Sequence, residues 1–343
     1  MYNIAIVGCG MMSSAWIEFT MKRSDCNIVA LIDVNIDNAN KKVQQNKLSA
    51  KTYTNLSTAL EKESIQLVFD ITPPEYHYDT VSTALSAGCN VFGEKPMSDS
   101  LESAYKLVDL SNRTNKEYFV MQNRRYISQI NDFKRFLHSE KLGNIGQLSA
   151  SFQLNPRFGG FREEMDSPLI ADMAIHTFDA ARYLLNKNPV SVYCKEFNPS
   201  WSWYKGNASA VCIFQMDDGS IFDYRGSWCT NGLNTSWESE WRATCSNGSA
   251  YWDGADKLIY DTGNVDIKIT GLADDENTQE TKVKDIAHAN ISFNSQHAGC
   301  LTEMFDALKS GVRPQTDCRD NIKSIEMVYK AIESAKTNTV ISF

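Results

Sequence analysis

The first third of the chain alternates short apolar runs with stretches of helical periodicity. The apolar runs lie at 4–7, 27–33, 66–72 and 117–122, with a shorter one at 91–92. Helical patterns follow Ser13 and recur at about 36–46, 57–63, 76–87 and 99–113. Strands that alternate with helices through short links run parallel, because each connection crosses over the sheet. The pattern predicts an α/β domain with a doubly wound parallel sheet at residues 1–123.

After about residue 124 the pattern changes to the alternation that is typical of half-exposed strands. These segments lie at 147–154, 190–197, 208–216, 220–228, 238–245 and 249–252. Asp218-Gly219 and Asn247-Gly248 are strong hairpin turns between such runs. Helices are expected at about 126–139, 170–185, 295–309 and 319–336. The sequence predicts a second domain, residues 124–343, of α+β type with an open, largely antiparallel sheet.

The composition limits the kinds of ligand and partner that the protein is expected to bind. The 343 residues carry a net charge of −8, which disfavours nucleic acid and anionic membrane surfaces and leaves a small molecule as the expected ligand. No apolar run could span a bilayer, and the N-terminus lacks the pattern of a secretory signal. Nine cysteines without a Cys-x-x-Cys pair suit reduced thiols in the cytoplasm. Five histidines without a Cys/His cluster predict no metal site.

A glycine-rich turn follows the first apolar run. Gly8 permits a tight turn, and Gly10 allows backbone N–H groups to approach a pyrophosphate at the start of the next helix. Ser13 replaces the third glycine of the usual fingerprint, which alone is a weak signal. The second apolar run ends in Asp33, about 20 residues later, where a ribose diol is held. Together these residues predict dinucleotide binding.

Two further strand ends carry candidate chemistry. The run at 66–72 stops at Pro73-Pro74, which opens a loop beside the expected cofactor, and His77 follows in that loop or in the next helical turn. Lys95 follows the run at 91–92, at the carboxyl end of a strand where open α/β sheets bind ligands. A solvated surface lysine is the alternative interpretation.

A third candidate lies in the helix expected at 170–185. Asp172 and His176 are four residues apart, so on an α-helix both side chains project from one face and could supply an oriented general base. The alternatives are a surface Asp/His pair or a histidine bound within the core. Candidates for lining a substrate pocket are Arg157, Phe158, Arg162, Trp201, Trp203 and Trp237.

Taken together, these motifs resemble the Gfo/Idh/MocA oxidoreductases, the family of glucose-fructose oxidoreductase and inositol dehydrogenase. The resemblance runs from end to end through Gly8-Cys9-Gly10, Asp33, Thr72-Pro73-Pro74 with His77, Gly93-Glu94-Lys95-Pro96 and Asp172-x-x-x-His176-x-x-Asp179. It implies a Rossmann domain and an open-sheet domain whose outer face forms a homodimer or homotetramer. It also implies an NAD(P)-dependent dehydrogenase that acts on the CH–OH group of a sugar or an inositol-like polyol.

The resemblance carries over residue by residue. Lys95, Asp172 and His176 match the catalytic set. The cofactor-binding positions are Gly8, Gly10, Met11, Met12, Asp33, Thr72, Pro73, Pro74, His77, Glu94, Lys95 and Asn123. The substrate-binding positions are Lys95, Arg125, Tyr126, Arg157, Asp172 and His176. Met173-Ala174 stands where the family often has a glycine, which leaves the shape of the substrate pocket open.

The residues permit a specific mechanism. His176 would take the hydroxyl proton, Asp172 would orient it or the substrate, and Lys95 would stabilise negative charge on the same oxygen. Asp33 favours NAD over NADP, because a carboxylate repels a 2′-phosphate. Two alternatives stay open: an NAD-containing glycosidase or epimerase that oxidises its sugar transiently, and a non-catalytic nucleotide-binding regulator on the same fold.

Overall fold

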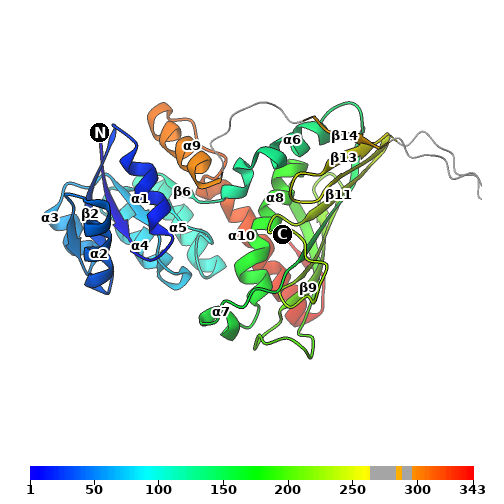
Figure 1. Cartoon of the computed structure of the whole chain (residues 1–343), viewed down its shortest axis with the longest axis horizontal. Coiled ribbons are helices and arrows are strands. Elements are labelled where there is room, and N and C mark those ends of the chain that lie inside the picture. Colours follow the sequence, from blue (N-terminus) through cyan, green and yellow to red (C-terminus); the bar gives the residue numbers. More distant parts are fainter. Residues whose placement is uncertain (263–282, 288–295) are drawn as a thin grey trace, which may run out of the picture. The chain divides into compact units, whose positions relative to one another are not determined.

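The computed structural model describes residues 1–262, 283–287 and 296–343 and forms two compact units. Unit 1 comprises Met1–Tyr126 and the described part of Phe293–Glu326, and unit 2 comprises the described part of Ile127–Ser292 with Met327–Phe343. The sequence predicted a single domain boundary between residues 123 and 124. In the structure, helix α9 (Gln296–Ser310) and the first part of α10 (Cys318–Thr337) belong with the N-terminal unit instead (Figure 1).

Unit 1 contains a parallel sheet of six strands in the order β3-β2-β1-β4-β5-β6. Its strands are β1 Tyr2–Val7, β2 Cys26–Ile32, β3 Lys51–Tyr53, β4 Leu67–Asp70, β5 Asn90–Gly93 and β6 Tyr118–Val120. This is the strand order of a Rossmann fold, so the predicted doubly wound sheet is confirmed. The prediction missed β3, whose three side chains are exposed or half-buried and therefore produce no apolar run.

The helices of unit 1 lie close to their predicted positions. They are α1 Ser13–Met21, α2 Ile36–Asn46, α3 Leu56–Lys62, α4 Pro74–Ser86, α5 Leu101–Thr114 and a 3-10 turn at Asn123–Tyr126. The side chains of Asn35, Asn55 and Ser100 accept backbone N–H groups at the starts of α2, α3 and α5. These caps satisfy donors that have no partner inside the helix, which explains where the three helices begin.

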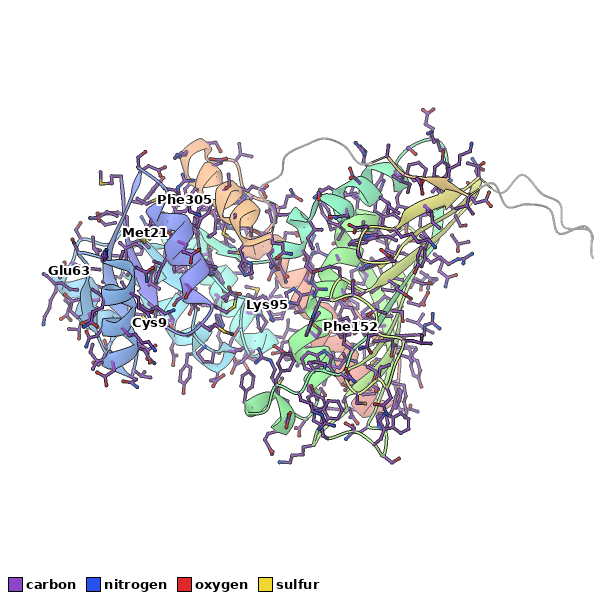
Figure 2. The ribbon with its side chains drawn as sticks, viewed as in Figure 1. Cys9, Met21, Glu63, Lys95, Phe152 and Phe305 are labelled. Carbon is purple, nitrogen blue, oxygen red and sulfur yellow. The ribbon has the colours of Figure 1, made fainter. Side chains whose placement is uncertain are left out.

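A row of phenylalanines crosses the core of unit 1. Phe69, Phe92 and Phe119 stand on the neighbouring strands β4, β5 and β6, with ring centroids 5.6 Å apart in each successive pair. Phe305 of α9, labelled in Figure 2, packs edge-on against Phe92, with 5.1 Å between the ring centroids. This contact joins α9 to the core of the first sheet, although about 200 residues separate them in sequence. The predicted first residue of this helix, 295, lies outside the described residues.

Unit 2 is built on a sheet of nine strands in the order β14-β13-β12-β11-β7-β10-β9-β8-β15. The strands are β7 Ile145–Gln153, β8 Pro189–Phe197, β9 Ser209–Met216, β10 Ile221–Ser227, β11 Glu240–Cys245, β12 Gly248–Trp252, β13 Leu258–Asp261, β14 Lys284–Asp285 and β15 Ile341–Ser342. Only β7 and β10 pair in parallel among the paired strands described. The predicted open, largely antiparallel sheet is confirmed.

Helices lie against one face of this sheet, and the other face is open (Figure 1). Unit 2 contains α6 Ser128–Leu137, α7 Phe161–Glu164, a π-helix at Leu169–Ala174, α8 Ile175–Leu185 and the end of α10. Along β8 and β9, buried side chains alternate with exposed or half-buried ones, as a sheet with one covered face requires. Across the described chain, no helix has both the length and the apolar character needed to cross a bilayer.

The helix expected at 170–185 is two segments of different geometry. Asp172 lies in the π-helix and His176 lies in α8, which follows it. The same-face argument for these residues assumed an α-helix, whereas a π-helix makes i→i+5 hydrogen bonds and turns each residue through a smaller angle. Residues four apart still fall close to one face on a helix of this geometry, so the expectation that Asp172 and His176 share a face stays a prediction.

Gly8 lies where two segments of unit 1 approach each other closely. Its φ is +91°, and a Cβ atom placed on it would lie 2.4 Å from the carbonyl oxygen of Ile71. Gly10 stands two residues later, and a Cβ atom there would meet nothing within 4 Å. Both the backbone angle and the contact at position 8 therefore require glycine, whereas position 10 tolerates a side chain.

We predict that Gly8→Ala destabilises the fold and that Gly10→Ala does not. Overpacking against rigid backbone, added to the left-handed φ, should cost Gly8→Ala on the order of 2–4 kcal/mol in the free energy of unfolding. Gly10→Ala should change it by less than about 0.5 kcal/mol. Urea denaturation of both variants measures the difference, and equal midpoints would contradict the role given to Gly8.

A buried ion pair lies at the carboxyl end of β4. Asp70 and His77 are both 0% exposed, and Nδ1 of His77 lies 2.8 Å from Oδ2 of Asp70. The other carboxylate oxygen accepts the hydroxyl of Thr72 at 2.6 Å and its backbone N–H at 3.2 Å. Burial acts to lower the pKa of His77, but Asp70, with a smaller contribution from Glu94, outweighs it and raises the pKa above 6.5.

The raised pKa of His77 predicts how the contribution of this ion pair to the stability of the fold depends on pH. A folded-state pKa above the unfolded value stabilises the protein fully below pH 6.5, and this stabilisation is lost as the pH rises through the folded pKa. Asp70→Asn leaves a buried histidine without its counter-charge, so at ~pH 6 it should cost about 3–5 kcal/mol. The difference from the unsubstituted protein should shrink at higher pH.

Urea denaturation across a pH series tests this expectation. The matched control is Glu102→Gln, which removes the carboxylate from the exposed Glu102–Lys106 pair and should show no comparable trend. A difference between Asp70→Asn and the unsubstituted protein that stays constant with pH would show that His77 is not charged in the folded state.

Candidate functional site

The glycine turn after β1 has the features of a phosphate-binding site. Helix α1 begins after this turn without a side-chain cap, in contrast to α2, α3 and α5, and without an acidic residue in its first turn, in contrast to α2 and α5. Gly10 is exposed, and Met11 is 86% exposed. Ser13 is buried and donates its hydroxyl to the carbonyl of Gly10 at 2.7 Å. The first N–H groups of α1 thus start at an open surface that fits an anion.

Asp33 ties the end of β2 to the same turn. Its Oδ2 accepts the backbone N–H of Cys9 at 2.9 Å, and its Oδ1 accepts the N–H of Asn35 at 2.9 Å. Burial, with the charge of Asp33, raises the pKa of the Cys9 thiol to about 12, so this cysteine stays protonated. Asp33, the residue predicted to bind the ribose, is therefore in direct contact with the turn predicted to bind the pyrophosphate. The two fit one dinucleotide.

The carboxyl end of β4 carries the next predicted cofactor-binding residues. Pro73 is exposed, and Pro74 is the first residue of α4, where a missing N–H costs nothing. Thr72 is bound to Asp70, and His77 lies in the first turn of α4. The side chain of His77 is fully buried and contacts Asp70. It therefore supports this turn from inside the unit.

Glu94 and Lys95 follow β5, at the same edge of the sheet (Figure 2). The Oε1 atom of Glu94 accepts the indole N–H of Trp16 at 3.0 Å and lies 3.7 Å from Nε2 of His297. Burial acts to raise the pKa of Glu94, but His297, Trp16 and Lys95 outweigh it and hold the pKa below its usual value. The carboxylate is therefore charged beside Lys95, which is half-buried.

His297 is a site residue that the sequence did not reveal. It stands in the first turn of α9, and its Nδ1 lies 3.2 Å from the side-chain nitrogen of Asn123, a predicted cofactor-binding residue. The only sequence signal was a histidine at the start of a helical pattern. Its partners are 174 and about 200 residues away, so only the packing of α9 against unit 1 reveals the contact.

Two predicted substrate residues make contacts within unit 1. Arg125 is buried and donates to the carbonyl of Gln315 at 2.8 Å and to Asp320 at 3.1 Å. The hydroxyl of Tyr126 donates to Glu303, and burial, together with nearby charges, raises its pKa far above the usual range. These contacts hold the 3-10 turn against α9 and α10. Arg125 and Tyr126 would therefore contribute to substrate binding only through the atoms that these contacts leave exposed.

Unit 2 carries the other two predicted catalytic residues. Oδ2 of Asp172 accepts Nε of Arg162 at 2.7 Å, which is a pairing that the sequence did not predict. His176 is half-buried, one turn further along. Arg157 is exposed, with its guanidinium carbon 4.0 Å from the ring centre of Trp203. The structure thus gathers the cofactor candidates in unit 1, and Asp172, His176 and Arg157 belong to unit 2.

Comparisons with known proteins agree with these features. Residues 2–122 match the model of an oxidoreductase family with an NAD-binding Rossmann fold, and residues 130–251 match the GFO/IDH/MocA C-terminal domain. An uncharacterized protein of Sinorhizobium fredii, y4oX, is 22% identical over 98% of this chain and 94% of its own. Inositol 2-dehydrogenase of Corynebacterium glutamicum strain R is 26% identical over 64% of this chain and 65% of its own.

Solved structures share the whole fold. An oxidoreductase from Agrobacterium radiobacter, crystallised with NAD+, L-tartaric acid and magnesium, superposes with a TM-score of 0.85 at 19% identity and covers 99% of this chain and 98% of its own. At that identity the likeness concerns the fold alone. The family models cover most of both units, and the glycine turn and Asp33 directly follow the strands β1 and β2 of the parallel sheet. The chain therefore belongs to the GFO/IDH/MocA oxidoreductase family, with its NAD-binding Rossmann fold in the N-terminal part.

Proposed function

We propose that this protein is an NAD-dependent dehydrogenase that transfers a hydride between the nicotinamide and an alcohol carbon of a sugar, a polyol or a sugar derivative. The observation that carries the proposal is the single edge of the parallel sheet at which the glycine turn, Asp33 and Lys95 all lie. This is the edge at which doubly wound sheets bind their ligands. NAD supplies the hydride chemistry, and the chain must bind, orient and move one proton.

In this proposal, the first N–H groups of α1 and the turn at Gly8–Ser13 hold the pyrophosphate, and Asp33 holds the adenosine ribose. Asp33 accepts two backbone N–H groups, which fix its orientation. The turn from Thr72 to Pro74 borders the same edge and is held by Asp70. These residues thus supply donors for a diphosphate and an acceptor for a diol.

Lys95, Asp172 and His176 act in one reaction in this proposal. His176 accepts the hydroxyl proton of the substrate during oxidation, and Asp172 positions it or the substrate. Lys95 donates to the same oxygen and stabilises its developing negative charge. Glu94 supports this role because its carboxylate, held by Trp16 and His297, places a fixed negative charge next to the lysine.

We also propose that the protein forms a homodimer or a homotetramer through the open face of the unit 2 sheet. Val190, Tyr193, Val211 and Ile213 of β8 and β9 are exposed there. Apolar side chains gathered on one open face are typical of a protein–protein interface. All nine cysteines are free thiols, which suits the reducing cytoplasm that we propose for the protein. Light scattering on the purified chain tests the assembly.

The proposed activity predicts NADH formation when NAD is mixed with a panel of polyols, aldoses and sugar acids. Lys95→Ala and His176→Ala should each lower kcat by about a hundredfold or more, the usual share of a positioned acid–base or electrostatic group. NADH affinity, measured by fluorescence titration, should change little in both variants. Lys62→Ala, which removes an exposed lysine at the end of α3, is the control and should retain full activity.

Three outcomes separate the dehydrogenase from the other functions that the sequence left open. Product without net NADH would indicate an enzyme that oxidises its sugar transiently and returns the hydride. Nucleotide binding without turnover on any panel member would favour a regulator. Unchanged turnover in His176→Ala or Lys95→Ala would remove that residue from the mechanism.

Asp33 predicts the choice of cofactor. The unsubstituted protein should use NAD in preference to NADP, because the Asp33 carboxylate repels a 2′-phosphate. Asp33→Asn keeps one carbonyl oxygen for the N–H of Cys9 and removes the charge, so the NAD/NADP ratio of kcat/KM should fall by about tenfold. Steady-state kinetics with both cofactors measure the ratio. A preference for NADP in the unsubstituted protein would contradict the assignment.

A further inference from the structure

Three loops of unit 2 begin at one end of its sheet. Strand β10 is parallel to β7, and both β8 and β10 are antiparallel to β9. The strands β7, β8 and β10 therefore point the same way, and the loops that follow them start at the same edge. These loops contain Arg157 and Phe158, then Trp203 and Tyr204, then Trp228 and Trp237. Short helix α7 lies at this end of the sheet (Figure 1).

Aromatic side chains from the three loops contact one another. We name Phe158, Trp203, Tyr204, Trp228 and Trp237 the aromatic platform. Ring centroids are 5.6 Å apart for Phe158 and Trp228, 6.2 Å for Phe158 and Trp237, 5.8 Å for Tyr204 and Trp228, and 5.4 Å for Trp203 and Tyr204. Trp228 is 1% exposed and Tyr204 3%, whereas Phe158 and Trp237 are each 46% exposed. The platform has a buried base and an open surface.

Hydrogen bonds between the loops hold this platform in place. The hydroxyl of Tyr204 donates to the carbonyl of Pro156 at 2.8 Å, and the indole of Trp201 donates to the carbonyl of Cys229 at 2.8 Å. The backbone N–H of Asn207 donates to the carbonyl of Asp166 at 2.8 Å. Each bond joins two different segments of unit 2, so the aromatic surface is ordered before any ligand arrives, which lowers the entropic cost of binding.

One cation at the platform has no carboxylate partner among the described residues. Arg162 is paired with Asp172 at 2.7 Å, and Lys205 lies 3.4 Å from Glu164. Arg157 instead stacks over Trp203, with its guanidinium carbon 4.0 Å from the ring centre. A guanidinium over a ring keeps its N–H donors available in its own plane, in the fork that matches a carboxylate.

The candidate catalytic carboxylate is connected to this platform inside unit 2. Arg162, which binds Asp172, also lies over the ring of Phe158, with 5.2 Å from its guanidinium carbon to the ring centre. A ligand resting on Phe158 would therefore contact the residue that orients Asp172. The surrounding carboxylates of Glu163, Glu164 and Asp172 favour a ligand with a single negative charge over a dianion, because one available cation balances one charge.

We propose that Arg157 and the aromatic platform recognise the carboxylate and the apolar ring face of a sugar acid, so that the preferred substrate is a monoanionic sugar acid rather than a neutral polyol. This inference rests on the proposed dehydrogenase function. The C–H face of the sugar packs on Phe158 and Trp237, and the carboxylate accepts two N–H groups from Arg157. The alcohol carbon that is oxidised lies elsewhere on the ring.

Matched pairs of sugars test the inference. The probes are glucose with glucuronate, galactose with galacturonate and mannose with mannuronate, each with NAD. We expect kcat/KM to be at least about tenfold higher for the acid in one pair or more, mainly through KM. Arg157→Ala should lower kcat/KM for that acid by about ten- to a hundredfold and lower it far less for the neutral partner. Arg157→Lys should restore only part of the loss, because an ammonium lacks the planar fork.

Calorimetric binding of the same acids to the protein with NAD separates this inference from the proposed function. Binding that depends on Arg157 without turnover would support the platform and contradict the dehydrogenase. Turnover of neutral sugars that equals that of the acids, or turnover of the acids that is unaffected by Arg157→Ala, would overturn the inference and leave the dehydrogenase standing. Absence of both binding and turnover for every acid would also overturn it. The thermal midpoint of each variant confirms that it is folded.

Discussion

A buried carboxylate, Asp70, and a largely buried one, Glu94, lie at the edge of the parallel sheet and need cationic or N–H partners, and much of unit 1 is arranged to supply them. Asp70 ends β4 and meets His77, and Glu94 follows β5 and meets Trp16 and His297. A buried charge without such partners would cost several kcal/mol. The partners come from α1, α4 and α9, so satisfying these two charges also positions three helices around the edge at which the glycine turn and Lys95 lie.

In unit 2, one parallel pair of strands decides at which end of the sheet the loops lie. A largely antiparallel sheet would send successive loops to alternate ends, but the parallel pairing of β7 with β10 places the loops after both strands at one end. Those loops carry aromatic rings that shield one another and a pair of arginines, of which Arg162 is bound to Asp172. The same edge therefore combines a carboxylate in an orienting ion pair with an ordered aromatic surface.

Local patterns were enough to predict most of the elements and part of the site. The positions of Gly8, Asp33 and Lys95 were predictable because each lies at or just after the end of an apolar run, and the parallel order then places all strand ends at one edge. The π-helix at Leu169–Ala174 was not, because an apolar periodicity cannot distinguish 3.6 residues per turn from a wider turn. The pairing of Asp172 with Arg162 was missed for a different reason, since the two residues are ten positions apart and lie in separate helical segments.

By itself, the sequence determined the α/β order of the first unit, the alternating strands of the second and the glycine turn with its acid, because these depend on interactions within a few residues. Tertiary structure alone decided that α9 joins the first sheet, that His297 reaches Glu94, that His77 is buried against Asp70 and that three loops form one platform. Such contacts join segments far apart in the chain, and their free energy comes from burial and charge pairing that exist only once the segments have packed.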